Sequence, residues 1–264
     1  MPRPLRRRSC DRAGDANDRS SNFAAFGPEK VNAYEIGAKT DLFDRRVRLN
    51  VAGYIMDRTG TQIDFDHVDT NQFLPGTAIP NPNYNLHTED TANAPGTSKI
   101  KGVEVDLTVR PVTGVTLGGS YAYTDANIPL TPNPQLAGNP LTQVFVVFTP
   151  KNALSGYAEF EVPVNVTDSG VLRFHIDANY SDPMYSFQAE NVLTDSGLTV
   201  NANVALAGIQ LNSLGQELKL SLWSRNLFNE AHVYRRSNAN NAVLGAYGNL
   251  NPPRTFGLEA SVKF

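Results

Sequence analysis

The chain has 264 residues with a net charge of −3, so it offers no electrostatic argument for a nucleic-acid partner. Its single cysteine, Cys10, excludes an intrachain disulfide framework and a zinc site built from cysteines. The longest strong apolar run, residues 144–148, is far shorter than the roughly 20 residues of a membrane helix. Any membrane insertion must therefore use a closed β-barrel.

Residues 1–25 are expected to form a disordered basic segment. Six arginines fall within the first 20 residues, but the apolar run of a secretory signal does not follow them. An arm that binds anionic surfaces is the alternative interpretation, and the composition favours simple disorder.

From Val31 onward, apolar and polar residues alternate with a period of two, which predicts nine antiparallel strands. In the last of them Phe256, Leu258, Ala260 and Val262 share one face with the terminal residue, Phe264. The expected strands span residues 31–41, 46–63, 98–110, 115–124, 143–162, 171–181, 197–206, 217–228 and 254–264.

The connections between these strands alternate between shorter and longer. Barrels of bacterial outer membranes have short periplasmic turns and long extracellular loops. The sequence therefore predicts an all-β fold, an antiparallel transmembrane β-barrel portion of about nine meander strands, with the C-terminus on the periplasmic side.

Aromatic residues fall near the ends of the expected strands. Tyr34, Tyr123, Tyr180 and Phe256 lie at the ends next to long connections, and Phe264 lies at an opposite end. Because amphipathic rings prefer the headgroup level of a bilayer, we predict that these five residues mark the two membrane interfaces. The opposite, polar face could line a watery lumen or meet bulk solvent on a soluble β-sandwich, and periodicity alone cannot separate the two.

Few residues suggest chemistry. The acidic and histidine residues of the first long connection do not follow a metal-ligand spacing, so we interpret them as a solvated loop; they are Asp64, Asp66, His67, Asp69, His87, Glu89 and Asp90. Catalytic motifs are not found, so neither an enzyme nor a cofactor is predicted. Near the last long connection, Tyr234, Arg235 and Arg236 could contact an anionic ligand such as a ferric chelate.

Five segments resemble motifs of TonB-dependent outer-membrane receptors, and they occur in the family's order. They are residues 28–39, 101–106, 117–125, 226–229 and 253–264. The resemblance implies a 22-stranded barrel with an N-terminal plug. It also implies uptake of iron–siderophore complexes, cobalamin or saccharides with energy passed on by TonB.

The resemblance covers residues 26–264, the C-terminal part of such a barrel. Residues 1–25 leave no room for a plug, a TonB-contacting box or the earlier strands, so we expect no transport by this chain alone. The resemblance implies location in the outer membrane of a Gram-negative bacterium, with membrane lipid and the barrel-assembly machinery as partners. Phe264 resembles the terminal aromatic signal that this machinery reads.

The resemblance implies that the nutrient and TonB bind only to the full-length receptor, TonB through its N-terminal part. A soluble or secreted all-β ligand-binding module is the alternative function. A small passive porin is disfavoured because single-chain bacterial barrels have even strand numbers.

Overall fold

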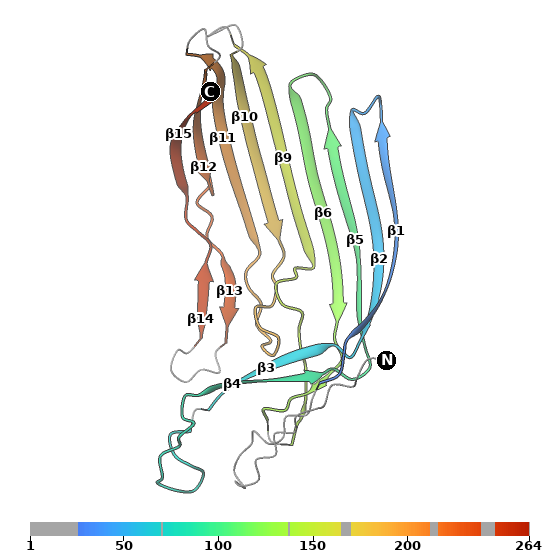
Figure 1. Cartoon of the computed structure of the whole chain (residues 1–264), viewed down its shortest axis with the longest axis vertical. Helices are drawn as coiled ribbons and strands as arrows, with labels where there is room; N and C mark the ends of the chain where they lie inside the picture. The colour runs from blue at the N-terminus through green and yellow to red at the C-terminus, as the bar shows by residue number, and fades with distance from the viewer. Residues whose placement is uncertain are drawn as a thin grey trace, which may run out of the picture.

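The computed structural model describes residues 26–69, 71–136, 138–164, 170–211, 216–238 and 246–263. Nine long strands in this part form one antiparallel sheet in which every strand pairs with the next long strand of the chain (Figure 1). They are β1 (Lys30–Leu42), β2 (Val47–Thr59), β5 (Thr97–Val109), β6 (Val115–Asn127), β9 (Asn152–Pro163), β10 (Val171–Ser181), β11 (Gly197–Gln210), β12 (Glu217–Arg225) and β15 (Thr255–Lys263). The predicted all-β fold and nine-stranded meander are confirmed.

The pairing register keeps one apolar face and one polar face across the sheet. One cross-strand row runs through Val51, Val105, Tyr121, Leu154 and Tyr180. The neighbouring row on the other side is polar and contains Asn50, Asp106, Ser120, Ser155 and Asn179. We refer to these two sides as the apolar face and the polar face.

The apolar face is not covered by other parts of the described chain. Its residues remain accessible even in inner strands, where Leu154 is 45% and Leu222 is 54% exposed. A soluble monomer rarely exposes an apolar surface that continues across so many strands. An exposed apolar face of this kind is typical of the outer surface of transmembrane β-barrels.

The short and long connections lie at opposite ends of the sheet. Residues 43–46 and 110–114 make short turns at one end, where β15 also finishes (Figure 1). Long connections, residues 60–96, 128–151, 182–196 and 226–254, gather at the other end. The predicted alternation of loop lengths therefore holds, and the last strand runs toward the short-turn end.

The long connections contain hairpins that the sequence did not predict. They are β3 (Gln62–Val68) with β4 (His87–Asn93), β7 (Thr131–Pro132) with β8 (Leu141–Thr142), and β13 (Val233–Ser237) with β14 (Tyr247–Leu250). The expected strand over residues 46–63 thus divides into β2 and β3. Gly60 has a φ of +68°, and this left-handed residue turns the chain out of the sheet.

The buried apolar core lies within these connections and not against the sheet. It consists of Ile63, Phe65, Ala94, Ile128 and Val144. This core explains why the expected strand over residues 143–162 was wrong in its first half. Val144 packs into the core, and the sheet strand starts only at Asn152.

Three other strand ends differ from the prediction by three or four residues. The strand expected to finish at residue 124 continues to Asn127. The strand expected to finish at residue 206 continues to Gln210, after a register shift between Leu206 and Ile209. The strand expected to reach residue 228 stops at Arg225, because Asn226 has a φ of +51° and begins a turn. Helices long and apolar enough to cross a membrane are not found in the described residues.

Large aromatic rings of the polar face lie flat over glycines of neighbouring strands. Tyr157 is paired directly with Gly118, and a Cβ built on this glycine would lie 2.7 Å from the tyrosine Oη. Trp223 lies over its partner Gly257 in the same way, with Cζ2 at 2.6 Å. The missing side chains let the rings follow the wall instead of projecting from it.

We expect Gly118→Ala to destabilise the sheet by about 1–3 kcal/mol, because the new methyl group would displace the Tyr157 ring. Gly156→Ala is the matched control, since its Cβ would meet only the Gly118 carbonyl oxygen at 3.7 Å. The measurement is the temperature at which the detergent-extracted protein loses its β-sheet circular dichroism. Equal midpoints for the two variants would contradict the role given to Gly118.

Candidate functional site

The apolar face changes to a polar surface near the long connections. On β5 and β6, Val103 and Tyr123 form the last apolar row, and the next row pairs Lys101 with Asp125, whose Nζ and Oδ2 atoms are 3.3 Å apart. One row further, Asp57 lies opposite Lys99. The sheet therefore continues beyond its apolar band and carries charges on the same side.

The height of the apolar band fits a bilayer. On β10, apolar-face residues extend from Leu172 to Tyr180, about 26 Å along the strand at 3.3 Å per residue. With the usual tilt of transmembrane strands this corresponds to about 20 Å of height, close to the apolar band of about 25 Å in outer-membrane barrels. The height of the face is therefore similar to that of the apolar band in outer-membrane barrels.

Tyrosines on the apolar face are anchored at this boundary through their hydroxyl groups. Tyr121 Oη donates to Asn152 Oδ1 at 2.8 Å, and Tyr180 Oη donates to Asp182 Oδ1 at 2.9 Å. The Asn152 side chain also donates to Asp182. This bond, together with Tyr180 and nearby Lys151, lowers the pKa of the Asp182 carboxyl, so the anion is stabilised one residue beyond β10.

Of the five aromatic residues that were predicted to mark the membrane interfaces, four lie in the described part of the chain. Tyr34, Tyr123 and Tyr180 lie on the apolar face toward the long connections, and Phe256 is exposed near the start of β15. Phe264 lies outside the described residues. Contact of these residues with lipid headgroups remains a prediction.

The polar face is held together by charged pairs between neighbouring strands. Arg173 Nε lies 2.8 Å from Glu161 Oε1. His175 lies between Glu159 and Asp177, at 3.1 Å and 3.5 Å. These contacts make His175 a part of the charged network on the polar face.

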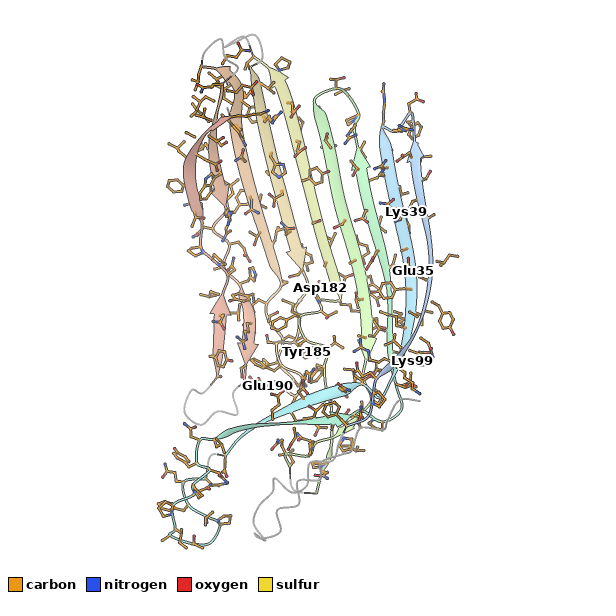
Figure 2. All side chains as sticks on the ribbon, viewed as in Figure 1. Glu35, Lys39, Lys99, Asp182, Tyr185 and Glu190 are labelled. Atoms are coloured by element: carbon orange, nitrogen blue, oxygen red, sulfur yellow. The ribbon has the colours of Figure 1, made fainter. Side chains whose placement is uncertain are left out.

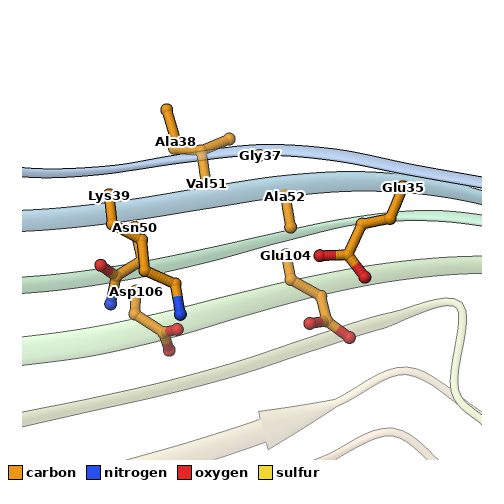
Figure 3. A pocket seen from close by; sticks show the side chains of 9 residues that line it. All are labelled: Glu35, Gly37, Ala38, Lys39, Asn50, Val51, Ala52, Glu104 and Asp106. Atoms are coloured by element: carbon orange, nitrogen blue, oxygen red, sulfur yellow. The ribbon is translucent and has the colours of Figure 1, made fainter.

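Near β1 the polar face forms a shallow groove of about 420 Å³. The side chains of Glu35 on β1 and of Glu104 and Asp106 on β5 project into it, on the same side as Asn50 of the intervening β2 (Figure 3). All three residues are exposed, and exposed carboxylates of this kind suit a polar lumen. Groups of three or more side chains placed to ligate a metal ion are not found among the described residues.

In the first long connection, two of the described carboxylates are hydrogen-bonded to other side chains. Asp64 accepts a hydrogen bond from Thr91 at 2.8 Å, and Asp90 accepts one from Gln135 at 2.6 Å, so both carboxylates are used within the connections. The side chains of Asp66, His67 and His87 lie outside the described residues.

The four long connections are tied to one another. Asp64 N–H donates to Gln188 Oε1 at 3.0 Å, which joins β3 to the third connection. Phe145 stacks on Tyr185 with ring centroids 4.0 Å apart, so the second connection also joins it. Figure 2 shows Asp182, Tyr185 and Glu190 along this third connection, between the sheet and the outer hairpins. The long connections thus form one interlocked layer beyond this end of the sheet, and we call it the outer layer.

The candidate ligand residues of the last connection have different surroundings. Arg236 Nη2 lies 2.8 Å from Asp195 Oδ1, so its charge braces two connections. Arg235 is exposed, with its guanidinium 5.1 Å from the centroid of the Phe187 ring, and Tyr234 is exposed beside it. Hydrogen bonding by Val233 N–H, followed by Arg236, lowers the pKa of the Asp195 carboxyl.

A buried asparagine organises the final turn before β15. Asn226 is 3% exposed, and its Nδ2 donates to the carbonyl oxygens of Glu230 at 2.7 Å and Pro252 at 3.1 Å. Its Oδ1 accepts the Glu230 N–H at 2.9 Å. Sequence reasoning recognised the segment containing Asn226 only as part of a motif. Its partner Pro252 is 26 positions away, so local patterns could not reveal this contact.

Comparisons with known proteins agree with this geometry. Residues 10–227 match the family model described as TonB dependent receptor-like, beta-barrel. Curated protein sequences give no match. Solved structures with the same fold include the ferric preacinetobactin receptor BauA of Acinetobacter baumannii, at 19% identity and a TM-score of 0.57 over 90% of this chain and 30% of that one.

Two further structures have the same fold. The ferric yersiniabactin uptake receptor FyuA of Yersinia pestis is 18% identical, with a TM-score of 0.59 over 89% of this chain and 30% of that one. The copper transporter OprC is 14% identical, with a TM-score of 0.61 over 93% and 33%. The chain thus spans about a third of the length of the structures that it matches.

Asn226→Ala is expected to loosen the last long connection by about 2 kcal/mol, because buried backbone groups lose their partners. Trypsin should then cleave this connection of the membrane-embedded protein about 30-fold faster. Asn83→Ala, an exposed asparagine of the first long connection, is the control and should match the unmodified protein. Equal cleavage of both variants would show that Asn226 does not hold the connection.

Proposed function

Because the chain belongs to the TonB dependent receptor-like β-barrel family, we propose that its nine strands form part of the wall of an outer-membrane receptor. The receptor takes up an iron–siderophore complex or a similar scarce nutrient. The observation that carries this proposal is the exposed apolar face, which continues across all nine strands on one side of the sheet.

The proposal fixes the orientation of the wall. The apolar face meets lipid, the polar face lines the lumen, and the long connections face the outside. Tyr34, Tyr123, Tyr180 and Phe256 lie at the outer interface, where their rings reach headgroup level. Phe264 belongs to the periplasmic rim and provides the terminal aromatic read by the barrel-assembly machinery.

The nutrient is proposed from the similar structures and the outer charges. Two of the similar structures are receptors for ferric chelates, and a third is a copper transporter. In the complete receptor, exposed Tyr234 and Arg235 contact an anionic chelate, while Asp195 holds Arg236 in position beside them. The proposal assigns no catalytic role and no cofactor to the chain. TonB acts through a part of the receptor outside these strands.

These strands do not transport by themselves in this proposal. In the described structure β1 and β15 are the two edges of an open sheet. Unpaired edge groups find no water in the hydrocarbon core of a bilayer, so further strands must close the barrel.

Cysteine labelling tests the orientation. In a Cys10→Ser background, Ile79→Cys lies in a long connection and Val112→Cys in a short turn, at positions that are 59% and 63% exposed. A membrane-impermeant maleimide should label Ile79→Cys in intact cells and Val112→Cys only after the outer membrane is permeabilised. Equal labelling in intact cells would favour a soluble or secreted module, and reversed labelling would overturn the orientation.

Growth tests the need for further strands. A strain that lacks its ferric-siderophore receptors and produces these 264 residues should not grow on a ferric siderophore as its iron source. The same cells should grow on excess ferrous iron, which shows that the protein is not toxic. Growth on the siderophore would show that the nine strands transport without a partner.

A further inference from the structure

Four lysines gather on the side of the apolar face, directly beyond its last apolar rows. They are Lys30 of β1, Lys99 and Lys101 of β5, and Lys151 just before β9. All four are exposed. Figure 2 shows Lys99 at the end of the sheet where the long connections begin.

The register shows that these lysines share one surface. Lys99 and Lys101 are two residues apart on one strand, so their side chains leave the same face about 7 Å apart. Lys30 lies four residues before Tyr34 on β1, on the same face, and one row beyond Lys99. The Lys151 Nζ lies 5.8 Å from the centroid of the Tyr123 ring, which belongs to the last apolar row.

Carboxylates on the same surface are fewer than the lysines. Three carboxylates accompany the four lysines: Asp57 lies across from Lys99, Asp125 pairs with Lys101 at 3.3 Å, and Asp182 lies near Lys151. The side chains of that ion pair are 62% and 41% exposed, so water weakens it and an incoming anion can exchange with the carboxylate. The surface therefore keeps a surplus of positive charge at the edge of the apolar band.

We propose that this lysine patch binds the phosphorylated headgroup of a glycolipid in the outer leaflet. The lysines lie at headgroup level and pair with the phosphates, and Tyr34 and Tyr123 contact the sugar and the start of the acyl chains. The chains then run along the apolar rows below. A headgroup with two phosphates fits a patch whose ammonium groups are spread over several strands. The inference rests on the proposed orientation in the membrane.

Continuity with the apolar wall is what selects a lipid as the ligand. A free phosphate would use the lysines but not the apolar rows, and a soluble protein would have to enter the headgroup layer to reach them. A phosphorylated lipid uses both parts of the surface.

The test measures lipid binding to the detergent-extracted full-length protein by native mass spectrometry. The probes are diphosphoryl lipid A, monophosphoryl lipid A and phosphatidylethanolamine, with inorganic phosphate as competitor. Lys99→Gln/Lys101→Gln should weaken diphosphoryl lipid A binding about tenfold or more, since each lysine near a charged headgroup contributes about a fivefold change. Monophosphoryl lipid A should bind more weakly to the unmodified protein and be less affected by the substitutions.

Lys219→Gln/Lys263→Gln is the matched control, because it removes the same charge from the polar face of β12 and β15. It should bind lipid A like the unmodified protein. Equal weakening by both double variants, no weakening by either, or full competition by inorganic phosphate would overturn the lipid site. Because Ile79→Cys labelling reports orientation separately, correct labelling with unchanged lipid binding rejects only the patch. Wrong labelling rejects the proposed function itself.

Discussion

The hydrogen-bonded register of the nine strands is the constraint on which the other features depend. Side chains alternate along each strand, so a slip of one residue would move a whole strand's apolar set to the opposite face. The register brings Val51, Val105 and Leu154 into one row and their polar neighbours into the next. The described sheet shifts register between Leu206 and Ile209, close to the short-turn end, so most of the apolar band is undisturbed.

The structure of the long connections depends on the two faces of the sheet. Where the chain leaves the apolar band, backbone groups still need partners, and the hairpins β3–β4 and β13–β14 supply them. Ile63, Phe65 and Val144 then bury their side chains among the connections, because the apolar face of the sheet offers no protein cover. Asn226, Asp195 and Gln188 tie these segments together. The outer end is therefore built as a small folded layer on top of the wall.

Aromatic side chains are held differently on the two faces of the sheet. On the polar face, Tyr157 and Trp223 lie over glycines, which keeps large rings close to the wall. On the apolar face, Tyr121 and Tyr180 direct their hydroxyl groups to Asn152 and Asp182, where the apolar band ends. Charges such as Lys99 follow immediately beyond. The position of a residue along a strand thus decides whether it lies in the apolar band, at the edge of that band or among the long connections.

The sequence by itself determined the strands, their two faces and the alternation of loop lengths, because all three depend on local periodicity and chain length. It also indicated the family through short motifs such as that containing Asn226. Tertiary structure alone decided the outer layer. Val144 lies in an apolar run that reads as a strand, yet it packs against Ile63 and Phe65. Contacts such as Arg236 with Asp195 join residues 41 positions apart, and local patterns carry no information about partners at that distance.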